Sequence, residues 1–411
     1  MTYPYGLRGS PAVGGGLPGL PQRGAPSAED TPFTVANDDV QEGIELLDGG
    51  AWGDAMTNSQ VLPIWHGAVG VSGATAQSAQ CSAVSPSGDL VIIPRDNTTN
   101  YSQYVRRRVG ATTYEALPNA PSFSGATGLF FSPDGRFLLK TGLGSNNKLY
   151  KWDGVELVDV TPSTLAANFT TAGACWSPNS DFFYVFGSVA PYIKRFNVTT
   201  EGIAEGSAPT DLTSSSTPRR GCVSKDGKFL AVIGGGHPYI YAYRIDGVEP
   251  SRLSAPDGLY STYMHAAFTK SGHLWLSSSD HGAIFVYDFN PASVLYKGFK
   301  NLGVSALRSF AVNETGDYLF TASTSISSAL YSGVVVFRIS QDSDGLPILL
   351  ETIDYFKYTN SGNVGVFSVS IDKVGSVFAI GANGITSNPV FVARKPLLQL
   401  GGRFIGVKAH D

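Results

Sequence analysis

One short turn motif recurs seven times along the chain and constrains the fold more than any other feature. Each copy follows a run of apolar residues and places a small residue at a tight corner, as in FSPDGRFLL beginning at Phe131. The corner residues are Gly88, Gly135, Ser180, Gly227, Gly272, Gly316 and Gly375. The first six corners lie 44 to 47 residues apart, whereas the last interval is 59 residues. A fixed period close to this length is typical of the four-stranded blades of β-propellers.

Within one copy the expected strands follow each other in order. In the second copy LFFS leads through Pro133-Asp134-Gly135 to RFLLKTG, and KLYKWDG and ELVDV come next. Because Pro presets φ and Gly accepts positive φ, this turn predicts a hairpin. We therefore predict an all-β fold, a seven-bladed β-propeller of four-stranded antiparallel blades. The predicted repeats are residues 78–120, 121–165, 166–212, 213–257, 258–303, 304–360 and 361–407. The long last interval predicts longer loops in the sixth blade, with its strands unchanged.

The domain division places a Gly/Pro-rich extended arm at residues 1–60 and the propeller at residues 61–411. The segment before residue 35 is rich in Gly and Pro for its length, with seven glycines and six prolines, and no apolar periodicity is present there. Such a segment buries too little apolar surface to order itself, so we expect it to anchor the protein by ordering on a partner. Two segments are alternatives for closing the ring: VLPIWH from Val61, pairing with the C-terminal blade, or Leu397–Val407 within the last copy.

Composition argues against several functional classes. The formal net charge is −4, which lacks the basic character of nucleic-acid-binding proteins, and no apolar run approaches the length of a membrane span. The N-terminus does not resemble a secretory signal. Cys81, Cys175 and Cys222 are dispersed and are interpreted as small core residues. No P-loop, G-x-S-x-G or H-E-x-x-H motif is present, so we expect a protein without catalytic residues, cofactor or bound metal.

One basic group forms a candidate binding site. Arg219, Arg220, His265 and Arg308 lie seven or eight residues before the corner glycines of three successive copies. In a propeller this position is near the central channel. The favoured interpretation of these four side chains is a solvated cluster with a structural role. The alternative is a basic channel mouth that binds a carboxylate, phosphate or acidic sugar.

The repeat sequences resemble a known group. GLFFSPDGRFLLKTG followed by NNKLYKWDG, together with YSQYVRRRVGATTYEALPN, is similar to WD-repeat-like propellers encoded among the structural genes of tailed bacteriophages. The similarity spans residues 78–407, although the Trp-Asp ending is kept only at Trp152-Asp153. It implies a non-enzymatic virion component, assembled in the host cytoplasm and associated with the capsid, neck or tail. The implied partners are other virion proteins, bound through the arm, and a host-surface glycan or receptor.

Two other functions stay open at this point. A lactonase-like propeller hydrolase would need acidic residues converging on the channel. A carbohydrate-binding propeller would use exposed aromatic rings on one rim, with Tyr260, Tyr263 and Trp275 as candidates, although core packing is the favoured interpretation of Trp275.

Overall fold

The computed structural model describes the greater part of the region after residue 65. For most of the described residues the structure gives both backbone and side chains, whereas β1 (His66–Gly70) is described by its backbone alone. The predicted arm, residues 1–60, lies outside the described residues. The described ranges are 66–70, 81–94, 104–109, 114–142, 147–166, 171–213, 218–235, 237–247, 249–254, 263–278, 280–304, 306–326, 331–358, 365–375, 377–383, 391–394, 399–400 and 403–404.

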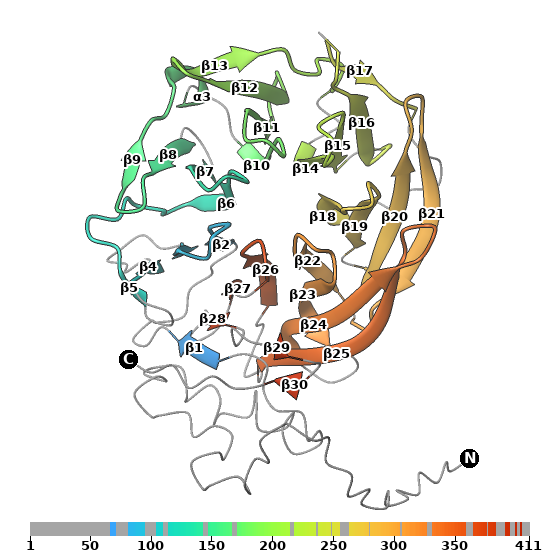
Figure 1. Ribbon diagram of the computed structural model, residues 1–411. Helices are drawn as coiled ribbons and strands as arrows, with labels where there is room; N and C mark the ends of the chain where they lie inside the picture. Colours follow the sequence, from blue (N-terminus) through green and yellow to red (C-terminus); the bar gives the residue numbers. More distant parts are fainter. Residues whose placement is uncertain are drawn as a thin grey trace, which may run out of the picture. The chain divides into compact units, whose positions relative to one another are not determined.

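Six antiparallel blades are each built from four consecutive strands (Figure 1). The first three blades are β2 (Ala83–Val84), β3 (Leu90–Ile93), β4 (Tyr104–Arg108) and β5 (Tyr114–Ala116); β6 (Ala126–Phe131), β7 (Phe137–Gly142), β8 (Lys148–Trp152) and β9 (Leu157–Asp159); and β10 (Thr171–Trp176), β11 (Phe182–Gly187), β12 (Ile193–Thr199) and β13 (Gly202–Gly206). The next three are β14 (Pro218–Val223), β15 (Phe229–Gly234), β16 (Ile240–Arg244) and β17 (Ser251–Arg252); β18 (Tyr263–Phe268), β19 (Leu274–Ser278), β20 (Ala283–Phe289) and β21 (Val294–Asn301); and β22 (Leu307–Val312), β23 (Tyr318–Ile326), β24 (Tyr331–Gln341) and β25 (Pro347–Tyr358). A short helix, α3 (Ser163–Ala166), joins the second and third blades.

The seven-bladed prediction needs correction at the seventh repeat. Among the described residues, this repeat supplies three strands to the sheet, β26 (Gly365–Ile371), β27 (Val377–Asn383) and β28 (Phe391–Arg394). The fourth position is taken by β1, which pairs antiparallel with β28, so the sheet order is β1-β28-β27-β26. Six blades are therefore formed as predicted, each by one repeat. The remaining sheet, called here the closing sheet, is composite because its fourth strand, β1, comes from the region before the first repeat. Later in the chain, β29 (Gln399–Leu400) and β30 (Arg403–Phe404) pair with each other in a separate two-stranded sheet.

The first strands of the repeats form the inner wall of a ring. Around this wall β2, β6, β10, β14, β18, β22 and β26 contact one another in order, and β26 contacts β2. Figure 1 shows these strands nearest the central axis, with the second, third and fourth strands progressively farther out. The closure between β26 and β2 includes a buried serine cluster. In it, Ser82 Oγ lies 3.2 Å from Ser368 Oγ and 3.1 Å from Ser370 Oγ.

The extra residues of the sixth repeat lie mainly in strands, which corrects the prediction of longer loops. β24 and β25 have 11 and 12 residues and pair along almost their whole length, interrupted by two register shifts. An insertion can lengthen a hairpin at the ring's outer side because no neighbouring sheet limits its length there.

Apolar side chains fill the spaces between adjacent sheets. The second strands are fully buried in several blades, including FLLKTG in β7 and FFYVFG in β11. Between the fourth and fifth blades, Ile233 and Ile240 on one side and Leu276 and Phe285 on the other are buried in one cluster. Strands covered on both faces must be apolar on both faces, which explains why these sequences show continuous hydrophobic runs. Within the described residues, no helix is long and apolar enough to cross a membrane.

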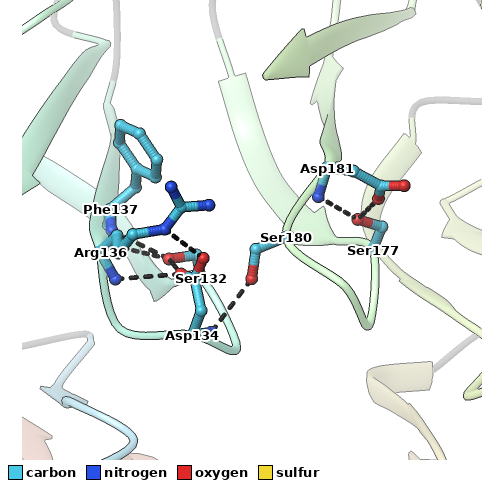
Figure 2. Close-up of polar contacts among 7 residues, drawn as sticks. All are labelled: Ser132, Asp134, Arg136, Phe137, Ser177, Ser180 and Asp181. Atoms are coloured by element: carbon cyan, nitrogen blue, oxygen red, sulfur yellow. Dashed lines mark hydrogen bonds and ion pairs between the residues drawn. The ribbon is translucent and has the colours of Figure 1, made fainter. Parts of the chain in front are cut away.

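A repeated polar bond holds the turn between the first two strands in six of the seven repeats; in the fifth, Thr269 Oγ1 instead donates to the carbonyl oxygen of His273. In the second blade the backbone N–H of Phe137 donates to Ser132 Oγ at 2.9 Å, and Ser132 Oγ donates to Asp134 Oδ1 (Figure 2). The same side-chain-to-backbone bond, spanning five residues, is made by Ser85, Ser177, Ser224, Asn313 and Asp372. The first residue of the turn is therefore selected for a short side chain that can accept this hydrogen bond.

Ser180 takes the place of the corner glycine and connects two blades. Its φ of 63° lies in the left-handed region, and its Oγ accepts a 3.0 Å hydrogen bond from the backbone N–H of Asp134 (Figure 2). Left-handed backbone costs a non-glycine residue about 1–2 kcal/mol. The hydrogen bond to the preceding blade offsets part of that cost.

We predict that residues 1–60 can be removed without loss of the ring, whereas removal through β1 destabilises it. A chain beginning at Val61 keeps β1 and should unfold at the same temperature as the full chain. A chain beginning at Val71 loses the pairing with β28, which should lower the free energy of unfolding by about 3 kcal/mol and leave a sheet edge exposed. Thermal unfolding of the two variants, compared directly, tests this. Equal melting temperatures would contradict the assignment of β1 as the closing strand.

We predict that Ser180→Ala lowers the free energy of unfolding by about 1 kcal/mol, because the bond to Asp134 is lost and the left-handed backbone remains. Ser180→Gly is the matched control. It also loses the bond but relieves the backbone, so it should be less destabilised than Ser180→Ala. Urea unfolding distinguishes the two variants, and a larger loss for the glycine variant would show that Ser180 is not strained.

Candidate functional site

A β-bulge recurs at one position of the inner strands, and the predicted site residues lie at this bulge or directly after it. The pairing of the first strand with the second shifts register by one residue in each repeat from the second onward, as between Pro218 and Arg220 or between Leu307 and Ser309. A bulged residue has no partner opposite it on the neighbouring strand. The residues at the bulge are Thr127, Ala172, Arg219, Met264, Arg308 and Phe367.

The predicted basic residues occupy the bulge or the position after it on three neighbouring inner strands. Arg219 and Arg220 lie on β14, His265 on β18 and Arg308 on β22. Because these positions are near the starts of the strands, they lie toward the end of the ring opposite the turns that follow β14, β18 and β22. The side chain of Arg219 is exposed, whereas the other three are partly buried.

Arg220 is an arginine of this group whose pKa is shifted by burial. Burial lowers the pKa of its guanidinium, and the group in turn lowers the pKa of His265. Gly173 on the adjacent strand β10 gives it space, because a Cβ there would lie 2.3 Å from the carbonyl oxygen of Arg219 and 3.3 Å from Cγ of Arg220. The charge is therefore held inside the ring by close contact between the third and fourth blades.

His265 is neutral at physiological pH. Burial, with a smaller contribution from Arg220, lowers its pKa to about 3. Its ring meets Phe310 edge-on, with 5.0 Å between centroids, and its buried Nδ1 has no hydrogen-bond partner among the described residues. A buried polar atom without a partner is costly and uncommon in proteins.

Arg308 spans the space between the fifth blade and the closing sheet. Its Nη1 donates to Met264 Sδ at 4.0 Å, and its Cζ lies 5.7 Å from the centroid of the Phe367 ring. Its buried Nε has no hydrogen-bond partner among the described residues. The salt bridges among the described residues involve cations other than Arg308, for example Arg107 with Glu115 and Arg252 with Asp211.

The arrangement thus brings Arg220, His265 and Arg308 onto three successive strands, while Arg219 points to solvent. In the described ranges, no three His, Cys, Asp or Glu side chains come together in a way that could hold a metal ion. The group has hydrogen-bond donors and positive charge. Its chemistry suits the binding of an anion.

The cysteines behave as buried apolar residues despite nearby cations. Burial raises the pKa of Cys81 to about 12, although Arg220 and Lys140 act to lower it, and burial also raises the pKa of Cys175 and Cys222. The Sγ of Cys81 lies 3.7 Å from the carbonyl oxygen of Ala126. Desolvation outweighs the cations, so none of the three thiols is ionised near neutral pH.

Two of the three aromatic residues considered as sugar platforms are buried. Tyr263 and Trp275 are buried, and the indole N–H of Trp275 donates to the carbonyl oxygen of Gly345 at 2.9 Å. Tyr260 lies outside the described residues. Tyr263 is therefore not a sugar platform, and Trp275 packs in the core as favoured from the sequence, because the inner and second strands are covered by neighbouring sheets.

Two exposed aromatic rings on the fifth blade were not identified from the sequence. Tyr296 and Phe299 on the outer strand β21 are 45% and 55% exposed. The ring of Phe299 stacks on Phe285 at 5.6 Å, and that of Tyr296 meets Tyr287 at 5.3 Å. Their position on a fourth strand was the available signal, since the outer strand of a propeller blade is its most exposed strand.

Comparison with solved structures identifies the fold. Sqt1 from Chaetomium thermophilum aligns with a TM-score of 0.55 at 13% identity, over 78% of this chain and 97% of that one. This chain is a β-propeller. The propeller domain of Cps50 (Swd1) from Myceliophthora thermophila gives a TM-score of 0.53 at 13% identity, over 79% of this chain and 98% of that one.

A protein assigned as a 6-phosphogluconolactonase of Bacteroides uniformis gives a TM-score of 0.52 at 17% identity, over 71% of this chain and 91% of that one. At these identities the likeness extends to the fold alone, in which both WD-repeat propellers and lactonase-named proteins are structural neighbours. None of these names refers to a bacteriophage. No protein-family model matches the chain, and no curated protein matches it.

We predict that the three thiols of the folded protein do not react with Ellman's reagent at pH 8. Their raised pKa values keep all three protonated, and burial also shields Cys81 and Cys175 from the reagent, whereas Cys222 is partly buried. Addition of denaturant should release all three. Rapid labelling of one thiol in the native protein would contradict the prediction, and its loss in the Cys81→Ser variant would show that Arg220 and Lys140 activate Cys81.

Proposed function

We propose that this chain is a non-enzymatic binding propeller that attaches to another protein through the outer strand of its fifth blade. The observation that carries the proposal is the exposure of Tyr296 and Phe299 on β21. Aromatic side chains are enriched at protein interfaces because one rigid ring buries a large area at small entropic cost.

The two rings are held in place before any partner binds. Phe299 rests on Phe285, and Tyr296 on Tyr287, which are buried in the core between the fourth and fifth blades. A side chain supported from below loses little freedom on binding. Lys297 between them is tied to Asp344 of the sixth blade by a 2.8 Å ion pair, which fixes the strand to its neighbour.

The specific setting that we propose is the particle of a tailed bacteriophage, in the capsid, neck or tail. Support for this setting comes from the sequence resemblance of the repeats to virion-associated propellers. Residues 1–60 would anchor the chain to a virion protein, and the propeller would present β21 to a second virion protein. A host-surface glycan or receptor is the alternative occupant of this rim, and it is distinguished below.

We predict that the chain co-purifies with intact particles and that Phe299→Lys reduces its amount there about tenfold or more, since truncation of a central aromatic residue has an effect of this size. Val155→Lys is the matched control, because Val155 is an equally exposed apolar residue on the second blade. A chain beginning at Val61 tests the arm separately. The measurement is the mass-spectrometric ratio of this chain to the major capsid protein.

Each result bears on one part of the proposal. Particles that lack the wild-type chain would overturn the virion setting. If Phe299→Lys is incorporated normally but the particles adsorb less well to the host, β21 binds a host receptor, and the proposed contact with a second virion protein is overturned. Equal effects of the Phe299 and Val155 variants would show that β21 is not a specific contact.

A further inference from the structure

We propose that the central channel binds a small oxyanion, a phosphate or a carboxylate, between Arg220, His265 and Arg308. This site is independent of the outer rim, since it lies on inner strands while Tyr296 and Phe299 lie on an outer one. It assigns a role to the three side chains that the proposed attachment surface leaves unexplained.

The first argument is uncompensated charge. Arg220 and Arg308 are partly buried on strands that flank His265, and neither forms a salt bridge to an acidic side chain within the described residues. Burying a cation without a counter-charge is strongly unfavourable, so buried cations in proteins are normally paired. An anion in the channel supplies the missing charge.

The second argument is the pair of hydrogen-bonding atoms without partners. Both Arg308 Nε and His265 Nδ1 are buried and unpartnered within the described part of the chain. An oxyanion has several lone pairs on a compact group and can accept from an arginine and an imidazole at once. Arginine is especially suited to this because its planar fork of N–H groups matches phosphate and carboxylate oxygens.

The third argument is the distribution of residues around the ring. At the position after the bulge, where β14 and β18 carry Arg220 and His265, other inner strands carry Gly128, Gly173, Ser309 and Ser368. The small residues at this position are closely packed: a Cβ on Gly128 would lie 2.5 Å from the Phe130 ring, and one on Gly173 would lie 2.3 Å from the carbonyl oxygen of Arg219. The two basic residues at this position lie on the neighbouring inner strands β14 and β18, which concentrates the positive charge in one part of the wall.

The site fits a small anion better than a large one. The bulge residues Met264 and Phe367 contact Arg308 from either side and narrow its approach. The neutral state of His265 allows its ring to donate one hydrogen bond without adding a third charge. The shared chemistry is therefore one anionic group with two or three oxygens, either free or as the end of a larger molecule.

The test is a titration of the full-length protein with inorganic phosphate and, separately, with succinate, in a buffer that contains neither ion. Calorimetry should give saturable binding to one of the two, and that ligand should raise the melting temperature. Saturation with phosphate alone assigns a phosphate site, and saturation with succinate alone assigns a carboxylate site. Binding of neither ion overturns the proposal.

Arg220→Met and Arg308→Met provide the decisive variants, with Arg244→Met as the control because Arg244 forms an exposed ion pair with Asp246. Each channel variant should weaken binding at least tenfold and abolish the ligand-dependent rise in melting temperature. The control should behave as the wild type.

A second readout separates binding from a structural role. If Arg220 is held ready for an anion, removing its unpaired charge should leave the ligand-free protein equally stable or more stable. A large loss of stability in Arg220→Met, with ligand binding unchanged in whatever protein folds, would show that the arginine only supports the ring.

Discussion

Backbone pairing between β1 and β28 is the interaction on which the ring depends. Each sheet in this fold is covered on both faces by its neighbours, so a ring that failed to close would expose apolar faces and a strand edge. The chain meets this requirement by joining segments more than 300 residues apart, with Val69 opposite Val392 and Gly70 opposite Phe391. The buried serine cluster of Ser82, Ser368 and Ser370 adds polar contacts at the same closure.

The turns provide a second level of organisation. A short polar side chain at the start of six of the seven turns satisfies a backbone N–H at the end of the turn, which would otherwise be buried without a partner. The turns also connect neighbouring sheets: the backbone N–H of Lys373 donates to the carbonyl oxygen of Pro86, and that of Glu314 donates to the carbonyl oxygen of Lys373. Local turn chemistry and ring geometry are thus specified by the same few residues.

Much of the architecture follows from the sequence because the turn motif marks the same point in every repeat. Counting back from the corner residue placed Arg220, His265 and Arg308 on neighbouring inner strands, where the structure has them. The closing strand could not be chosen, since His66–Gly70 is short and carries no repeat signal. The number of complete blades was overestimated because the repeat motif does not show that the seventh sheet takes its fourth strand from His66–Gly70.

The exposure of individual side chains was harder to predict. Simple alternation does not hold through a bulge, so the exposed Arg219 and the partly buried Arg220 could not be distinguished. Trp275 and Phe299 are both aromatic residues on strands, yet one is buried and the other is more than half exposed. The difference arises from strand order in the blade, which only the assembled sheets define.

The bulge also has a consequence for how such a protein can change over time. A residue that has no cross-strand partner can be replaced without altering the register of the strands on either side. The side chains now at this position include a threonine, an alanine, a methionine, a phenylalanine and two arginines, with no common size or polarity. Mutation can therefore vary the wall of the channel one blade at a time, while selection for a stable scaffold acts on other residues.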